Sequence, residues 1–156
     1  MHILVKGKSA ALSTKEVRFA VKFFAMLLMT KRMAESLSIE VAFVNDKHDK
    51  AHASMTWIDR NVRPKVYDVE LNAKMGKRRL LIALAHEMVH IKQFAKGEMK
   101  DYISEKKYRQ FVKWRNEDFS SDMMYWERPW EIEAYGRELG LYEMYKTEIR
   151  EKKIKF

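Results

Sequence analysis

The chain has no cysteine among its 156 residues, which excludes disulfide bonds and every zinc site built from thiolates. Histidine is scarce, with five residues, so a metal site would have to combine imidazoles with carboxylates. That mixture is more typical of catalytic zinc than of structural zinc. Only two prolines interrupt the chain and 47% of its residues are hydrophobic, which indicates a globular protein with a substantial core.

Long hydrophobic runs are also missing. The apolar stretch at the N-terminus is too short for a signal peptide. The apolar run at 19–29 is interrupted by Lys22 and is too short to cross a bilayer. We therefore expect a cytoplasmic protein with no membrane partner, folded as a single domain over residues 1–156.

Acidic residues are outnumbered, because 31 Lys and Arg face 22 Asp and Glu and leave a net charge of +9. The basic residues occur in separate short groups, at 77–79, 106–109 and 152–155. These basic residues do not form part of a recognised nucleic-acid-binding motif. This pattern favours a solvated surface and leaves nucleic acid as a weakly supported partner.

What the sequence does contain is the segment AHEMVHIKQ, in which His86, Glu87 and His90 follow the order H-E-x-x-H. Chance produces this order in on the order of 1–2% of chains of this composition, since any short motif carries such a risk. Residues four apart lie on one face of a helix, so both imidazoles can reach one metal ion. Glu87 is then placed to take a proton from a water whose pKa zinc lowers.

The surroundings of the motif predict a buried helix over about 76–96. The run 80–85 is apolar on all sides, and Gly97 provides a natural C-terminal end. Two histidines and a glutamate would be costly to bury in such a helix without a partner. The motif therefore indicates a metal site with Zn²⁺ as the cofactor, and Glu87 as the catalytic residue.

Catalytic zinc usually has three protein ligands, and no histidine follows His90 in the chain. We expect the third ligand to be a carboxylate from the segment ERPWEIEAYGREL, where Glu131 and Glu133 compete. Glu131 shares its helix face with Ala134 and other apolar residues, which favours it as the ligand. Glu133 stays open as the alternative, and otherwise as a surface or outer acid.

The remaining periodicities predict an α+β fold. Ser13 begins a helix that continues to about Ser36, with a capping box at its start. Alternating residues predict three strands, and Pro129 suits the first turn of a last helix. The predicted strands are 38–44, 51–58 and 65–71, and the last helix runs over 129–152. Residues 102–113 fit a charged helix, while 111–119 around Arg115-Asn116 fit a short hairpin.

HEMVH followed some forty residues later by PWEIEAY resembles the small glutamate-zincins, which are minimal zinc metallopeptidase domains. The chain looks most like the compact SprT-like or phage-encoded zinc peptidases. The resemblance implies His86, His90 and a downstream glutamate as ligands, and Glu131 matches the family's E-x-x-A pattern. It implies Glu87 as general base. It also implies an edge strand that receives an extended peptide, either 65–72 or its neighbour 51–58.

Some further side chains invite functional interpretations. Tyr125 and Tyr135 could stabilise an oxyanion, although a core or hairpin position is the simpler expectation for each. The aromatic residues Trp126 and Trp130 suggest core packing or a wall of the cleft rather than base stacking. His48 and His52 repeat an H-x-x-x-H spacing, but the polar loop around them favours a solvated turn.

Together these patterns predict a zincin-like protein with an N-terminal helix, a small three-stranded sheet, the H-E-x-x-H helix and a ligand-bearing C-terminal helix. The expected function is zinc-dependent hydrolysis of peptide bonds, with a peptide or protein substrate, in the host cytoplasm if the chain is phage-encoded. The alternative is a catalytically silent module of the same fold, whose basic surface binds nucleic acid or a partner protein.

Overall fold

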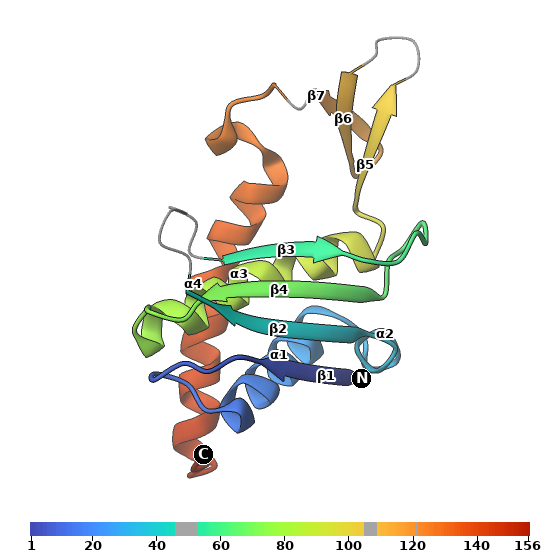
Figure 1. Ribbon diagram of the computed structural model, residues 1–156. Coiled ribbons are helices and arrows are strands. Elements are labelled where there is room, and N and C mark those ends of the chain that lie inside the picture. The colour runs from blue at the N-terminus through green and yellow to red at the C-terminus, as the bar shows by residue number, and fades with distance from the viewer. Residues whose placement is uncertain (46–52, 105–108, 121) are drawn as a thin grey trace.

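The computed structural model describes residues 1–45, 53–104, 109–120 and 122–156, and shows an α+β protein. Its elements follow the chain as β1 (His2–Lys6), α1 (Thr14–Leu28), α2 (Lys31–Glu35), β2 (Ser38–Val44), β3 (Ala53–Trp57), β4 (Val66–Asn72), α3 (Lys77–Ala95), β5 (Met99–Ser104), β6 (Arg109–Trp114), β7 (Glu117–Ser120), η1 (Tyr125–Glu127) and α4 (Pro129–Glu151). Figure 1 shows a larger sheet beside α3 and α4, and a small sheet that stands apart from it.

The larger sheet has four strands in the order β1-β2-β4-β3, so the prediction of three strands was wrong. The additional strand, β1, pairs in parallel with β2, while β3 runs antiparallel to β4 at the opposite edge. A five-residue strand whose partner lies 36 residues away has little local signal, which explains why periodicity missed it. Strand β4 lies inside the sheet, so of the two predicted edge strands only β3 is one.

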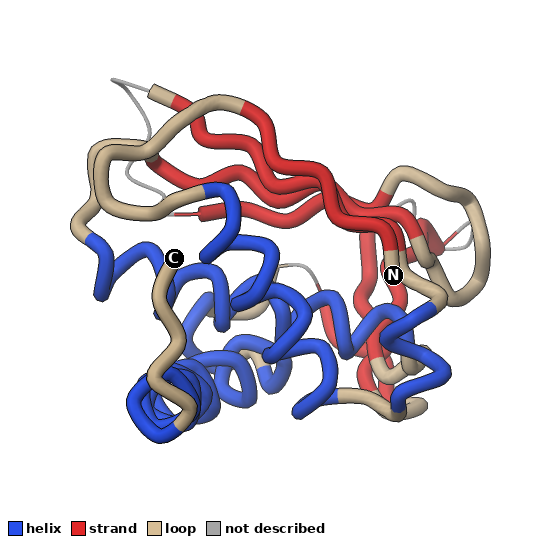
Figure 2. Tube along the Cα trace, turned by 90° about the horizontal axis from the view of Figure 1, so that it is seen from below, coloured by secondary structure: helices blue, strands red, loops and turns tan. Residues whose placement is uncertain are grey.

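One face of this sheet carries the core. Tyr67, Val69 and Leu71 alternate along β4 and are fully buried, as the period-2 pattern predicts. Figure 2 shows the helices gathered on this face, while the other face of the sheet remains uncovered. None of the helices in the described part of the chain is long and apolar enough to span a membrane.

The first predicted helix is present but divided in two. The Ser13 hydroxyl caps α1 by accepting a hydrogen bond from the Glu16 amide over 3.1 Å, as predicted. The backbone then becomes extended at Met29, and the Thr30 hydroxyl caps the short helix α2. Thr30 is therefore an N-cap in the middle of the segment that was predicted to be one helix.

The small sheet has the order β5-β6-β7 and follows α3 directly. The helix predicted over 102–113 is wrong and the alternative hairpin is confirmed, because β6 and β7 join at Arg115 and Asn116. These two residues have φ angles of 46° and 74°, as the tightest hairpin turns require. The Trp114 and Trp130 rings lie 6.5 Å apart, which anchors the hairpin to the start of α4.

Candidate metal centre

Helix α3 places the two histidines of the motif one turn apart on the same buried face. His86 and His90 are 8% and 9% exposed, and their Nε2 atoms lie 3.1 Å from each other. The Nε2 atoms are the ends of the imidazoles that face away from the helix axis, so both approach one point.

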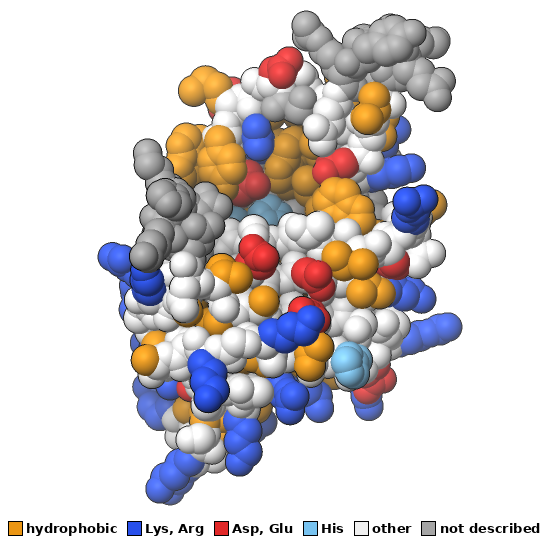
Figure 3. Space-filling view, in the orientation of Figure 1, with side chains coloured by type: hydrophobic (Ala, Val, Ile, Leu, Met, Phe, Trp, Pro, Cys, Tyr) orange, Lys and Arg blue, Asp and Glu red, His pale blue; other side chains and the backbone are white. Residues whose placement is uncertain are grey.

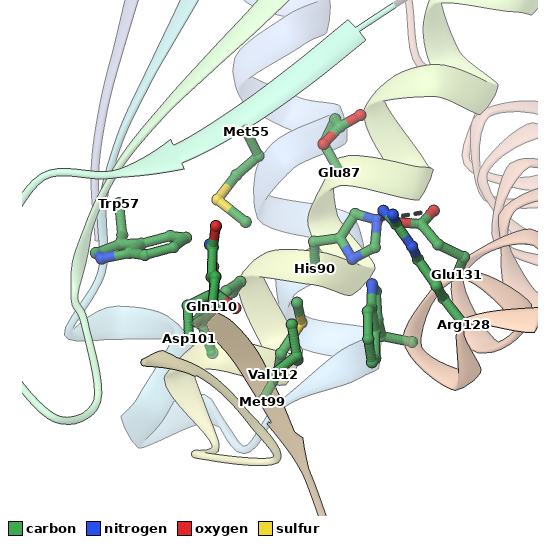
Figure 4. A pocket seen from close by; sticks show the side chains of 12 residues that line it. Met55, Trp57, Glu87, His90, Met99, Asp101, Gln110, Val112, Arg128 and Glu131 are labelled. Carbon is green, nitrogen blue, oxygen red and sulfur yellow. Dashed lines mark ion pairs between the residues drawn. The ribbon is translucent and has the colours of Figure 1, made fainter. Parts of the chain in front are cut away.

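Helix α4 brings Glu131 to that point from 41 residues further along the chain. Its Oε2 atom lies 3.4 Å from His86 Nε2 and 3.6 Å from His90 Nε2. Atoms that bind one zinc ion tetrahedrally at about 2.1 Å lie about 3.4 Å from one another. The three groups, which are all buried, can therefore hold one metal ion. Figure 4 shows Glu131 facing His90 across this point.

The hydrogen bonds around His90 show which of its ring nitrogens carries the proton and which one can bind a metal ion. The amide nitrogen of Gln93 donates over 3.0 Å to the Trp130 carbonyl and over 3.0 Å to Glu133 Oε2, both of which only accept. The amide oxygen of Gln93 must then face His90 Nδ1, 2.8 Å away. His90 therefore donates from Nδ1, and in the neutral ring its Nε2 carries a lone pair.

His86 is oriented in the same way by a carboxylate. Its Nδ1 lies 2.8 Å from Oε2 of Glu138, which leaves the Nε2 lone pair of the neutral ring directed at Glu131. The Glu131 oxygen that faces both rings also accepts a hydrogen bond from the Tyr125 hydroxyl over 2.7 Å. Three acceptor atoms thus converge, and such a group is stable only with a cation among them.

In the metal-free protein, a proton on His86 supplies the positive charge that the three converging acceptor atoms require. Burial opposes a charge on His86, but its hydrogen bonds with Glu131 and Glu138 outweigh burial and raise its pKa to about 9. Burial would likewise raise the pKa of Glu131, yet the hydrogen bonds with His86 and His90 hold it far below its usual range. The pocket thus favours positive charge between the two imidazoles and the carboxylate.

This balance makes metal binding depend on pH. A ligating histidine must be neutral, so zinc has to displace the His86 proton at any pH below about 9. We expect about one proton to be released per zinc bound at pH 7.5, and affinity to fall about tenfold per pH unit below 9. Calorimetry in buffers of different ionisation enthalpy measures this number, and a value near zero would contradict it.

The metal-free protein should respond to pH in the corresponding way. Because the folded-state pKa of His86 lies above the ordinary 6.5, this group contributes stability below about pH 6.5. The contribution disappears as the pH rises through about 9. Saturation with zinc should abolish this dependence, which provides the control for the proton count.

Glu87 lies beside His86 in α3 and is not part of the triangle. It is 7% exposed, and none of the described residues forms a hydrogen bond with its carboxylate. Burial raises the pKa of Glu87, while the charges on His90 and His86 oppose the rise. Figure 4 shows its side chain at the cavity, on the β3 side of His90. A buried carboxylate left free in this way can exchange a proton with a molecule in the cavity.

Glu133, the alternative ligand, points elsewhere. Its carboxylate binds Lys92 at 2.8 Å, Arg115 at 3.3 Å and Arg137 at 3.2 Å. Burial acts in the opposite direction, but the hydrogen bonds from Lys92 and Gln93 lower the pKa of Glu133. Glu133 thus joins α3, the β6–β7 turn and α4 through ion pairs, and it touches the site only through Gln93.

The aromatic residues are distributed differently from the expectation. Tyr125 and Tyr135 are 40% and 41% exposed at the rim of the site rather than in a core, and the Tyr135 ring lies 4.6 Å from that of His86. Trp126 is 67% exposed, whereas Trp130 is buried and lines the cavity. The second histidine pair, His48 and His52, lies outside the described residues.

Sequence reasoning assigned no role in the site to Glu138, a partner of His86, or to Gln93, a partner of His90. Both have a spacing that could have identified them. Gln93 follows His90 by three residues, and Glu138 follows Glu131 by seven, so each shares a helix face with a ligand. A search for acceptors at these spacings would have found both.

The centre lies in a cavity of about 380 Å³ between the larger sheet and the small one. Met55 and Trp57 of edge strand β3 form one wall, and Val112 of β6 belongs to the opposite wall. Figure 3 shows a histidine at the bottom of a hollow that hydrophobic side chains frame. The cavity therefore joins a metal-binding group, a free carboxylate and an open strand edge.

Comparisons with protein-family models, curated proteins and solved structures found no match for this chain.

Proposed function

We propose that this chain is a zinc-dependent metallopeptidase with a zincin-like arrangement of sheet and site helices. The observation that carries the proposal is the free, buried carboxylate of Glu87 beside the triangle of His86, His90 and Glu131. A site that only stored or sensed a metal would have no need for an unpaired acid next to its first ligand.

The donor set fits zinc. Two imidazoles and one carboxylate, with no thiolate, are typical of catalytic zinc, which keeps a fourth position open. Glu138 and Gln93 hold the imidazoles in the required tautomer, as the outer partners of metal-bound histidines do. Zinc bound here supplies a Lewis acid that polarises a carbonyl group and makes water more acidic.

The remaining steps belong to the residues of the chain. Glu87 accepts the proton of the attacking water and returns it to the leaving amine, for which its raised pKa is suitable. The Tyr125 hydroxyl lies at the rim of the site and donates its single proton to Glu131, so it would face the developing oxyanion only after releasing that hydrogen bond.

The substrate would bind as an extended peptide along β3. Among the described strands, β3 pairs only with β4, so its outer backbone groups are free to form hydrogen bonds. An added strand gains affinity from main-chain hydrogen bonds and specificity from alternate side chains. Met55 and Trp57 of β3 also line the cavity, so this strand would guide the peptide past the centre.

The alternative of a silent module with a basic binding surface has less support. On the face in Figure 3, lysine and arginine side chains are spread over the lower half and both flanks rather than gathered in one patch. The three basic side chains of the Glu133 network, Lys92, Arg115 and Arg137, are engaged in ion pairs within the protein.

The proposal predicts that peptide hydrolysis follows zinc content. The protein is stripped with a chelator, titrated with zinc and assayed against a library of quenched fluorescent peptides at neutral pH. Cleavage should be lost on stripping and return in proportion to zinc, with saturation at one equivalent. Stoichiometric zinc binding without cleavage of any peptide would favour the silent module instead.

A further inference from the structure

The cavity extends well beyond the metal-binding group. Figure 4 shows Glu131 and Arg128 at one end, His90 in the middle, and Trp57, Gln110 and Asp101 at the other end. The proposed catalytic steps do not use this far end.

Asp101 is the charged residue that distinguishes the far end. In β5 it lies opposite Val112 of β6, and Met99 precedes it by two residues on the same face. All three side chains consequently line the cavity. The sheet therefore presents an acid between apolar residues, directed at the space where a substrate side chain would enter.

Among the described residues, none is a hydrogen-bond or ion-pair partner of the Asp101 carboxylate. Its Oδ1 atom is buried and forms no hydrogen bond, and no described residue has an ion pair with Asp101. Burial alone raises its pKa, with no compensating cation. A desolvated oxygen without a partner destabilises the folded protein, and such groups in native proteins usually have a role.

The walls around Asp101 suit a long side chain with a charged end. Trp57 and Phe94 form an aromatic pair with ring centroids 4.4 Å apart, and both line the cavity together with Met99. Lysine and arginine have an apolar stem and a cationic head, so they can pack along such a wall and reach an acid at its end.

We propose that Asp101 selects substrates with lysine or arginine at a residue flanking the cleaved bond. The inference rests on the proposed function and names the class of substrate that the same site prefers. The cationic head pairs with the buried Asp101 oxygen, and the stem packs on Trp57 and Phe94. Asp101 thus determines specificity and takes no part in the bond-breaking step.

The test uses peptides that differ only at the residues flanking the cleaved bond, with lysine, its neutral isostere norleucine, or glutamate. Wild type should prefer lysine over norleucine in kcat/KM by about tenfold or more, the worth of a buried charged hydrogen bond. Asp101→Asn should bring the lysine-to-norleucine ratio close to one. Asp118→Asn, the same change at an exposed position of the small sheet, is the control and should keep the wild-type ratio.

Two results would overturn the inference: equal cleavage of lysine and norleucine peptides by wild type, or an unchanged ratio in Asp101→Asn. A binding measurement separates this inference from the proposed function. Fluorescence anisotropy of labelled lysine and norleucine peptides is measured on zinc-loaded Glu87→Gln, with and without Asp101→Asn. A lysine preference in binding that depends on Asp101, together with a zinc-loaded wild type that cleaves none of the peptides, would sustain the subsite and refute the peptidase. Cleavage of the peptides without a lysine preference would sustain the peptidase and refute the subsite.

Discussion

Replacing Glu87 with glutamine should lower kcat for peptide hydrolysis by on the order of 10²–10⁴-fold, the usual contribution of a general base. Glutamine has the shape of glutamate but cannot accept the proton of the attacking water. Glu87 touches none of the three ligand side chains by a hydrogen bond, so the variant should still bind one zinc ion per chain. Zinc content by mass spectrometry and kcat from the peptide assay measure the two effects on one sample.

The matched control is Glu143→Gln, which makes the same chemical change on the exposed surface of α4, where Glu143 pairs with Lys146. It should leave both zinc content and kcat at the wild-type level. Full activity in zinc-loaded Glu87→Gln would remove Glu87 as the base. Loss of zinc from that variant would instead show that Glu87 supports the metal directly.

The second large effect concerns the two neighbouring glutamates of α4. Glu131→Ala should reduce zinc affinity by more than the roughly 10–100-fold that is typical of changing an outer partner. The reason is that Glu131 supplies one of the three converging atoms, at 3.4 Å and 3.6 Å from the two imidazole nitrogens. Competition with a chelator of known affinity measures the loss.

Glu133→Ala is the internal comparison, since it removes a carboxylate only two residues away. This variant should still bind one zinc ion at saturation, but its free energy of unfolding should fall by about 1–3 kcal/mol. Lys92, which is only 4% exposed, would keep Glu98 as its remaining ion-pair partner. Zinc loss in Glu133→Ala alone, with Glu131→Ala unaffected, would reverse the ligand assignment.

The parts of the fold that sequence reasoning predicted well are those with local signals. The motif helix, strand Ser38–Val44 and the Pro129 helix start each follow from a periodic pattern or a capping residue. Strand β1 and the full extent of the small sheet were missed or left ambiguous. Strand β1 pairs with a segment 36 residues away, and the short amphipathic runs of the small sheet fit a helix and a strand about equally well.

The residues of the candidate site likewise differ in whether the local sequence could identify them. The candidate ligands could be named because the H-E-x-x-H order is itself local, and because Glu131 shares its helix face with Ala134 and other apolar residues. The partners that fix the tautomers were not named: Gln93 follows His90 by three residues within α3, whereas Glu138 meets His86 through the packing of α3 against α4. Asp101 gained significance only when the small sheet placed it in the same cavity as His90.

The hydrogen bonds of Gln93 also restrict how this protein can evolve. One amide uses its acceptor for His90 and its donors for the Trp130 carbonyl and Glu133. Glutamate at position 93 would lack both donors and would repel Glu133, while asparagine would be one methylene too short. A lineage that keeps the metal centre is therefore constrained more tightly at position 93 than at position 133, because losing Glu133 removes one acceptor of Gln93 but leaves its hydrogen bonds with His90 and the Trp130 carbonyl.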